Sequence, residues 1–242
     1  SLAKAGHSIS LISQSPYTPS LYSKFCKESI ISPKESNKNE YMDFIQGLIK
    51  SRKYDLLIPI SDLCTEYFSE SREDLSKYVN ITMPSKEAID IARNKDKTYR
   101  FCQQNNIPIP DTNFISCLSD IDNLKDKISF PCVVKQTKGT GGRGNQYIEN
   151  KEDFILKFKS FENNNMLIVQ EFIKGKFFGL TAVCNRGEII SFFMFEVLRQ
   201  YPDKDGITVY ARSFYNSHGY EVCADLIKKL DWSGPIDFDC FI

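Results

Sequence analysis

The stretch Phe130-Pro-Cys-Val-Val-Lys-Gln-Thr-Lys-Gly-Thr-Gly-Gly-Arg-Gly-Asn145 joins an apolar run to a basic, glycine-rich loop. The run from Pro131 to Val134 predicts a buried strand that carries Lys135 at its end. The loop that follows contains Lys138 and Arg143 as well as four glycines, Gly139, Gly141, Gly142 and Gly144. Because glycine has no Cβ, backbone N–H groups in such a loop can approach an anion closely. Strand, lysine and loop together predict a phosphate-binding site.

The glycine-rich loop admits two interpretations. Gly139, Gly141 and Gly144 match the pattern G-x-G-x-x-G, which in a dinucleotide-binding oxidoreductase leads directly into a helix. Here the residues from Asn145 to Ile148 alternate as they do in a strand. A strand–turn–strand flap that closes over phosphates is therefore favoured. The oxidoreductase stays as an alternative that requires a helix after Gly144.

Composition limits the classes of protein to consider. Of the 242 residues, 41% are hydrophobic and 26% are charged, which is ordinary for a globular chain. The 31 basic and 31 acidic side chains balance, so neither nucleic acid nor a membrane surface is expected as a partner. No apolar run approaches the roughly 20 residues of a membrane helix, and no signal peptide opens the chain. The eight cysteines are scattered singly and only two histidines occur, which argues against disulfides and zinc and favours a reduced, cytoplasmic protein.

The pattern along the chain predicts an α/β (α+β) protein of two domains. In the first third, helices alternate with short apolar strands, among them Tyr54 to Ile60, which we expect to be buried on both faces. Ile107-Pro-Ile-Pro-Asp-Thr112 predicts a rigid extended linker, because two prolines prevent a helix. Beyond it we expect a helix from Leu118 to Lys127, a hairpin of Phe177–Asn185 and Glu188–Arg199, and a last strand from Gly234 to Ile242.

Three further features each have a chemical and an ordinary interpretation. Lys97 begins a helix and with Lys135 would offset triphosphate charge, although either alone is an ordinary surface lysine. The strand from Met166 to Ile173 could hold an adenine through backbone groups and apolar contacts, or could be a plain core strand. Asp237 and Asp239 lie two apart on the last strand, so both point away from its apolar residues. Two carboxylates on one face suit Mg²⁺, and a solvated sheet face is the ordinary alternative.

The order of these parts resembles the ATP-grasp superfamily, especially its carbamoyl-phosphate-synthase-like and carboxylate–amine ligase branches. The parts are Asp96-Lys97, Ile107–Pro110, Val133–Lys135 with the glycine loop, Gln170–Ile173 and Asp237–Asp239. The resemblance covers nearly the whole chain. It implies a Rossmann-like pre-ATP-grasp domain over residues 1–84, then an ATP-grasp domain over 85–242 with an antiparallel sheet and a glycine-rich flap. The second domain would divide into subdomains at about 112–172 and about 173–242, the latter incomplete at its C-terminal end.

The resemblance also implies roles for single residues and ATP and Mg²⁺ as cofactors. Lys97 and Lys135 match the two lysines that bind the nucleotide, and Lys138 to Gly144 match the flap over its phosphates. The adenine hinge would be formed by Gln170, Glu171, Phe172 and Ile173. Asp239 matches the metal-binding carboxylate, with Asp237 as the alternative. Arg212 and Arg199 occupy positions that often hold the acyl phosphate or the substrate.

Two departures from the family pattern affect the expected activity. Phe177 stands where the family often has a ribose-binding glutamate, so the ribose contact must differ or be weaker. The usual Glu-x-Asn metal pair would lie beyond Ile242. The first residues resemble the tail of a helix and the last ones an interrupted strand. We therefore expect a chain that is cut at both ends and inactive by itself.

The implied function is that of an ADP-forming ligase. It would activate a carboxylate as an acyl phosphate for attack by an amine or a similar nucleophile. Its partners would be small-molecule carboxylates and amines, which no shared motif identifies, and the oligomeric state is open, with a homodimer as one option. The alternative is a nucleotide-binding module without catalysis.

Overall fold

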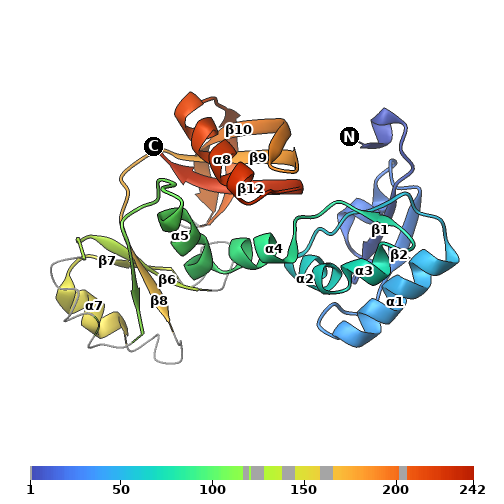
Figure 1. The fold of residues 1–242 in the computed structure, drawn as a ribbon, viewed down its shortest axis with the longest axis horizontal. Coiled ribbons are helices and arrows are strands. Elements are labelled where there is room, and N and C mark those ends of the chain that lie inside the picture. The colour runs from blue at the N-terminus through green and yellow to red at the C-terminus, as the bar shows by residue number, and fades with distance from the viewer. Residues whose placement is uncertain (1, 117–119, 121–127, 138–144, 159–165, 202–205) are drawn as a thin grey trace. The chain divides into compact units, whose positions relative to one another are not determined.

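The computed structural model describes residues 2–116, 120, 128–137, 145–158, 166–201 and 206–242. The chain divides into two compact units, Ser1–Met83 and Pro84–Ile242, which we describe separately (Figure 1). Most of the predicted helix from Leu118 to Lys127 lies outside the described residues, as do all residues from Lys138 to Gly144. The architecture is mixed α/β, as the sequence predicts.

The first unit combines parallel strand pairs with helices. β1 (Ser10–Ser13) pairs with β2 (Glu28–Ile31), and β3 (Leu56–Leu57) pairs with β4 (Asn80–Ile81), both in parallel. The helices are η1 (Leu2–Ala5), η2 (Pro19–Tyr22), α1 (Lys38–Ser51), α2 (Asp62–Glu70) and α3 (Arg72–Leu75). The two parallel pairs confirm the predicted α/β character, and the Rossmann-like assignment of this unit stays a prediction.

The expectation that the run from Tyr54 to Ile60 is buried on both faces is wrong. Only Leu56 and Leu57 pair with a neighbouring strand, and Leu56 and Ile60 are 45% and 89% exposed. Pro59 has no N–H to donate, so the ladder cannot continue through it. The buried core of the unit is built largely on α1, whose buried residues recur at helical spacing: Tyr41, Met42, Ile45, Leu48 and Ile49.

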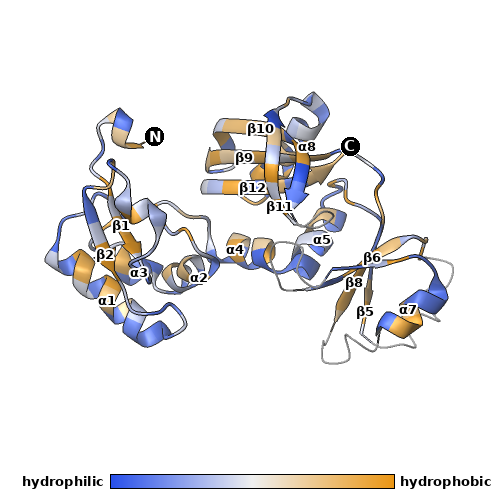
Figure 2. Cartoon of the chain, turned by 180° about the vertical axis from the view of Figure 1, so that it is seen from behind, coloured by the Kyte–Doolittle hydropathy of each residue, from blue (hydrophilic) through white to orange (hydrophobic). Residues whose placement is uncertain are grey.

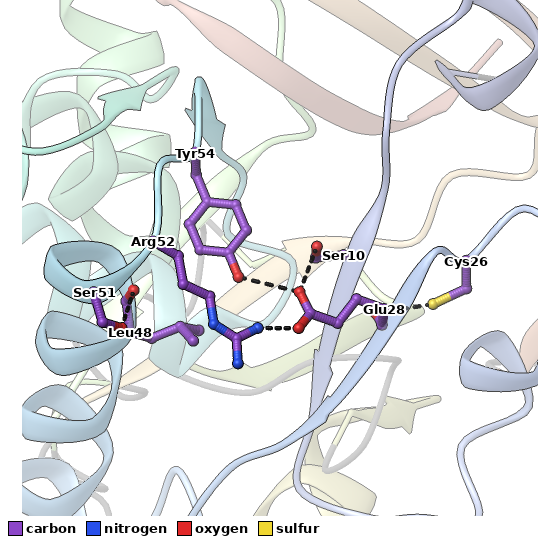
Figure 3. Close-up of polar contacts among 7 residues, drawn as sticks. All are labelled: Ser10, Cys26, Glu28, Leu48, Ser51, Arg52 and Tyr54. Carbon is purple, nitrogen blue, oxygen red and sulfur yellow. Dashed lines mark hydrogen bonds and ion pairs between the residues drawn. The ribbon is translucent and has the colours of Figure 1, made fainter.

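A polar cluster joins the start of the first strand pair to the end of α1 (Figure 3). The carboxylate of Glu28 accepts a hydrogen bond from Ser10 Oγ at 3.1 Å and forms an ion pair with Arg52, the residue that caps α1. The hydroxyl of Tyr54 also donates to Glu28, at 3.4 Å. The Arg52 hydrogen bond is the main reason that the pKa of Glu28 lies below its ordinary value.

The second unit begins with α4 (Lys86–Arg93) and α5 (Lys95–Gln104), followed by an antiparallel sheet. Its strands lie in the order β5 (Thr112–Ile115), β8 (Leu167–Glu171), β6 (Cys132–Gln136) and β7 (Gln146–Ile148). One face packs on the amphipathic helix α7 (Lys151–Phe158) through a core that includes Phe154, Val134 and Val169 (Figure 2). The strand β7 stands where the oxidoreductase alternative requires a helix, so the structure contradicts that alternative.

A second antiparallel sheet follows, in the order β11 (Ile207–Ser213), β10 (Glu188–Tyr201), β9 (Phe177–Asn185) and β12 (Gly234–Phe241). The pairing of β9 with β10 confirms the predicted hairpin, whose turn residues Arg186 and Gly187 both have positive φ. One face packs on α8 (Ser217–Lys229). The β12 residues in that core are Ile236, Phe238 and Cys240, which confirms that the two aspartates between them point to the other face.

The helix α5 contacts both sheets of the second unit. On one side, the guanidinium of Arg100 lies 4.0 Å from the ring centroid of Phe114 in β5. On the other, Phe101 and Cys102 share a core with Leu226 of α8 and Phe238 of β12. None of the helices in the described part of the chain combines the length and the apolar composition that crossing a bilayer requires.

Candidate functional site

Lys135 lies near the end of β6, as predicted, on the sheet face that does not contact α7. Its Nζ donates a hydrogen bond to Oε1 of Gln170 at 2.7 Å. Gln170 is 2% exposed, and its Nε2 donates to Thr112 Oγ1 at 2.8 Å. The structure therefore brings the predicted site residues Lys135 and Gln170 into direct contact. It also places Thr112, which the sequence does not mark as a site residue, against Gln170.

Tyr99 of α5 and Asp239 of β12 lie beside this group. The ring centroid of Tyr99 is 6.0 Å from Lys135 Nζ. Burial raises the pKa of Tyr99, a hydrogen bond with Gln170 opposes the rise, and the charge of Asp239 adds to it. Burial also raises the pKa of Asp239, repulsion from Asp237 raises it further, and Lys135 lowers it. The side chain of Asp239 is exposed to solvent, and the protein around it is still sufficient to raise its pKa.

The predicted adenine hinge follows directly from β8. The N–H groups of Glu171 and Phe172 donate to Asp111 O and Pro131 O, and the Glu171 carboxylate accepts from Asp111 N at 2.9 Å. Among the described residues, no backbone carbonyl accepts a hydrogen bond from the N–H of Ile173. It can therefore donate to a ligand edge, which is the chemistry that holding an adenine requires. The Phe172 ring, 40% exposed, lies edge-on to Tyr147.

The two predicted metal ligands offer hard oxygen donors on one sheet face. The hydroxyl of Thr181 hydrogen-bonds to Asp237, and Asp239 pairs in register with Gly179. No group of three or more His, Cys, Asp or Glu side chains that could hold a metal occurs within the described ranges. Mg²⁺ is commonly held by one or two carboxylates together with water and phosphate oxygens. Asp237 and Asp239 therefore fit a partial magnesium site that bound phosphates would complete.

Lys97 is held by an acidic side chain of the preceding helix. Its Nζ forms an ion pair with Asp90 of α4, and both side chains are about half exposed. The backbone N–H of Lys95, two residues earlier, donates to the carbonyl of Thr137, two residues beyond Lys135, at 3.1 Å. Partial burial lowers the pKa of Lys95. The sequence marks Lys95 only as another charged residue at the start of a helix.

The two predicted arginines are held by other side chains. Arg212 forms an ion pair with the buried Glu196, at 2.6 Å between Nη2 and Oε2. In the sheet register, Glu196 of β10 pairs with Arg212 of β11 on one side and with Phe178 of β9 on the other. Phe178 belongs to the core under α8, so all three residues lie on the face that packs on this helix. Arg212 and Asp239 therefore lie on opposite faces of the sheet. Arg199 lies over the Tyr210 ring, 5.7 Å from its centroid. The structure therefore does not bring Arg212 to Asp239.

Phe177 stacks on Phe241 with their ring centroids 5.2 Å apart. The two residues are register partners on the face that also carries Asp239. An aromatic pair thus occupies the position at which the family resemblance places a ribose-binding carboxylate. The predicted flap residues Lys138, Gly139, Gly141, Gly142, Arg143 and Gly144 lie outside the described residues, although β6 and β7 on either side of them are antiparallel neighbours.

The family model for the ATP-grasp domain matches residues 100–242, which include every site residue above except Tyr99, Lys97 and Lys95. The chain belongs to the ATP-grasp family. Among solved structures, the L-amino acid ligase from Bacillus licheniformis superimposes with a TM-score of 0.74 at 14% identity, over 99% of this chain and 60% of that one. The biotin carboxylase from Campylobacter jejuni gives 0.75 at 15% identity, over 98% and 57%.

Curated relatives are similar to parts of the chain. N5-carboxyaminoimidazole ribonucleotide synthase of Saccharolobus solfataricus is 25% identical over 200 residues, covering 78% of this chain and 52% of the relative. The probable alpha-L-glutamate ligase 1 of Shewanella frigidimarina is 35% identical over 98 residues, covering 38% and 32%. This ATP-grasp chain therefore spans between about a third and about half of the length of these relatives.

Proposed function

We propose that the protein is an ADP-forming ATP-grasp ligase that joins a carboxylate to an amine. The carboxylate oxygen would attack the γ-phosphorus of ATP, forming an acyl phosphate and releasing ADP. The amine nitrogen would then attack the acyl carbon, lose a proton and expel phosphate. Family membership and the contact between Lys135 and Gln170 at the end of β6 support this proposal, because phosphoryl transfer depends mainly on positioned positive charge.

Each group of the site would have a separate task in this reaction. Lys135 would bind the nucleotide phosphates, and the Ile173 N–H would hold the adenine edge. Asp239, with Asp237 beside it, would bind Mg²⁺, which neutralises phosphate charge. Relatives named as a glutamate ligase and an N5-carboxyaminoimidazole ribonucleotide synthase support a ligase. The amine and the carboxylate remain unspecified, because these relatives act on different substrates by name.

A nucleotide-binding module without catalysis is the second candidate, and Phe177 favours it. An aromatic ring cannot accept hydrogen bonds from the ribose hydroxyls as a glutamate can. For either function, the Phe177–Phe241 pair predicts that ATP and 2′-deoxyATP bind with similar affinities. A strong preference for ATP in a competition titration would show that another group recognises the ribose.

An ADP-release assay distinguishes the two candidates. The full-length protein is incubated with MgATP and pools of amino acids and other carboxylic acids, and ADP is measured. Release that requires both a carboxylate and an amine supports the ligase. ATP binding in calorimetry without release in any pool supports the binding module, and the absence of ATP binding would contradict both.

A further inference from the structure

We propose that Cys223 and Cys240 form an oxidation site, at which hydrogen peroxide joins their sulfur atoms in a reversible disulfide between α8 and β12. The two Sγ atoms already lie in contact, 3.9 Å apart. The bond would act on the strand that carries Asp237 and Asp239. That effect rests on the proposed magnesium-binding function of the two aspartates, whereas the formation of the disulfide does not.

The two cysteines come from different elements and meet on the face of the second sheet that α8 covers (Figure 1). Cys223 belongs to the buried core under α8, and Cys240 packs against that core from β12. Because successive residues of a strand point to opposite faces, Cys240 points toward α8 while its neighbour Asp239 points away from it. The pair of thiols therefore lies across the sheet from the candidate magnesium site.

The remaining cysteine of this core lies too far along the sheet to compete for Cys240. Cys184 of β9 pairs with Gly234, which precedes Cys240 by six residues on β12. A strand rises about 3.4 Å per residue, so roughly 20 Å of β12 separate Cys240 from the position opposite Cys184. Cys223 is thus the cysteine of this core that Cys240 meets.

The exposures of the two thiols set the order of the reaction. Cys223 is 2% exposed and Cys240 is only partly buried, so peroxide would reach Cys240 first. The Cys240 sulfur attacks one peroxide oxygen, the O–O bond breaks, and a sulfenic acid and one water form. The Cys223 sulfur then attacks the sulfenic sulfur and expels a second water. The two thiols lose two electrons and both hydrogens, peroxide is reduced to two waters, and a dithiol reverses the reaction by exchange.

Closing the bond requires movement next to Asp239. An S–S bond is about 2.0 Å long, so the sulfur atoms must approach by roughly 1.9 Å. Rotation of the two side chains supplies part of this approach, and the rest falls on the backbone. Cys223 sits in a fully packed core, whereas β12 is the last of the four described strands and pairs with β9 alone among them. Oxidation should therefore displace β12, and with it the carboxylate of Asp239.

Peptide mass spectrometry of the oxidised full-length protein tests the site. The reduced protein is treated with hydrogen peroxide, the remaining thiols are alkylated, and the digest is searched for linked peptides. We expect a peptide that joins Cys223 to Cys240 and that dithiothreitol separates. Cys223→Ala should abolish it and leave a sulfenic acid on Cys240 that dimedone traps. Cys184→Ala, the matched control in the same core, should retain it.

Calorimetric titration of the reduced and oxidised forms with MgATP tests the effect on β12. Oxidation should weaken binding about tenfold, as disturbing the surroundings of a metal ligand typically does, and dithiothreitol should restore it. In Cys240→Ala the same peroxide treatment should leave the affinity unchanged.

The outcomes separate the two proposals. The absence of the linked peptide would overturn the oxidation site, and a linked form that binds MgATP as tightly as the reduced form would overturn its effect on β12. A reduced protein that does not bind MgATP would overturn the proposed function, while the linked peptide would still decide the oxidation site. If Cys223→Ala fails to fold, Cys240→Ala takes its place as the variant that must lack the linked peptide.

Discussion

Replacing Gly179 by alanine should destabilise the second unit, because a phenylalanine ring already occupies the space of the new methyl group. Gly179 lies between Phe195 of β10 and Asp239 of β12 in the sheet register. A Cβ at this position would lie 2.3 Å from Phe195 Cζ and 2.7 and 2.8 Å from its Cε atoms. Carbon atoms prefer separations of about 3.5–4.0 Å, so the ring or the strand must move by more than about 1 Å.

The expected magnitude follows from two opposing effects. Crowding of this kind typically costs about 1–3 kcal/mol, whereas removing a strand glycine contributes about 0.5–1 kcal/mol in the other direction. The free energy of unfolding should therefore fall by about 1–2 kcal/mol. In a Phe195→Ala background the crowding is absent, so Gly179→Ala should there be neutral or slightly stabilising.

Trp232 provides the measurement. It is the single tryptophan of this chain, is 7% exposed and belongs to the core under α8 with Phe178 and Leu180, the neighbours of Gly179. Urea denaturation followed by its fluorescence gives the four free energies of the cycle. Gly47→Ala, in an exposed helical position of α1 in the first unit, has nothing near the new methyl group; followed by far-UV circular dichroism, this control should raise helix stability by up to about 1 kcal/mol. If Gly179→Ala destabilises both backgrounds equally, within about 0.5 kcal/mol, the ring is not the cause.

Three further outcomes are expected. Lys135→Ala should weaken ATP binding about 10- to 100-fold in calorimetry, as the loss of a charged hydrogen bond implies, while Lys157→Ala, which removes an exposed lysine paired with a carboxylate, should not. Glu28 has a lowered pKa, so its stabilising contribution is present above the ordinary glutamate pKa and is lost as pH falls through the lower folded value. In thermal melts between about pH 5 and pH 3, Glu28→Gln should therefore lose less stability than the unsubstituted protein. Asp239 has a raised pKa, so Mg²⁺-dependent ATP binding should weaken on acidification at a higher pH than an ordinary aspartate would give, and Asp239→Asn should abolish both the Mg²⁺ requirement and this pH dependence. Equal affinities for Lys135→Ala and Lys157→Ala, parallel acid profiles for Glu28→Gln and the unsubstituted protein, or an unchanged Mg²⁺ requirement in Asp239→Asn would each contradict the corresponding assignment.

Local patterns in the sequence predict the last strand and the β9–β10 turn of the second unit. The alternation of polar and apolar residues predicts β12 and places Asp237 and Asp239 on one face, since successive side chains in a strand point to opposite sides. Asn185-Arg-Gly187 predicts the β9–β10 turn because glycine readily adopts a positive φ. The same kind of reasoning fails at Tyr54–Ile60, where the hydrophobic run predicts burial but only Leu56 and Leu57 pair and Leu56 and Ile60 are exposed.

The order of motifs along the chain determined the family, because motif residues and their spacing are properties of the sequence itself. Only the tertiary structure decided which of those residues meet. Gln170 reaches Lys135 and Thr112 through the register of three strands that are far apart in sequence, whereas Lys97 pairs with Asp90 and Arg212 with Glu196. Strand order and register arise from the packing of the whole sheet against α5 and α7, and a one-residue shift would move every side chain to the other face. A lysine after an apolar run is therefore visible in the sequence, and the buried amide that it contacts is not.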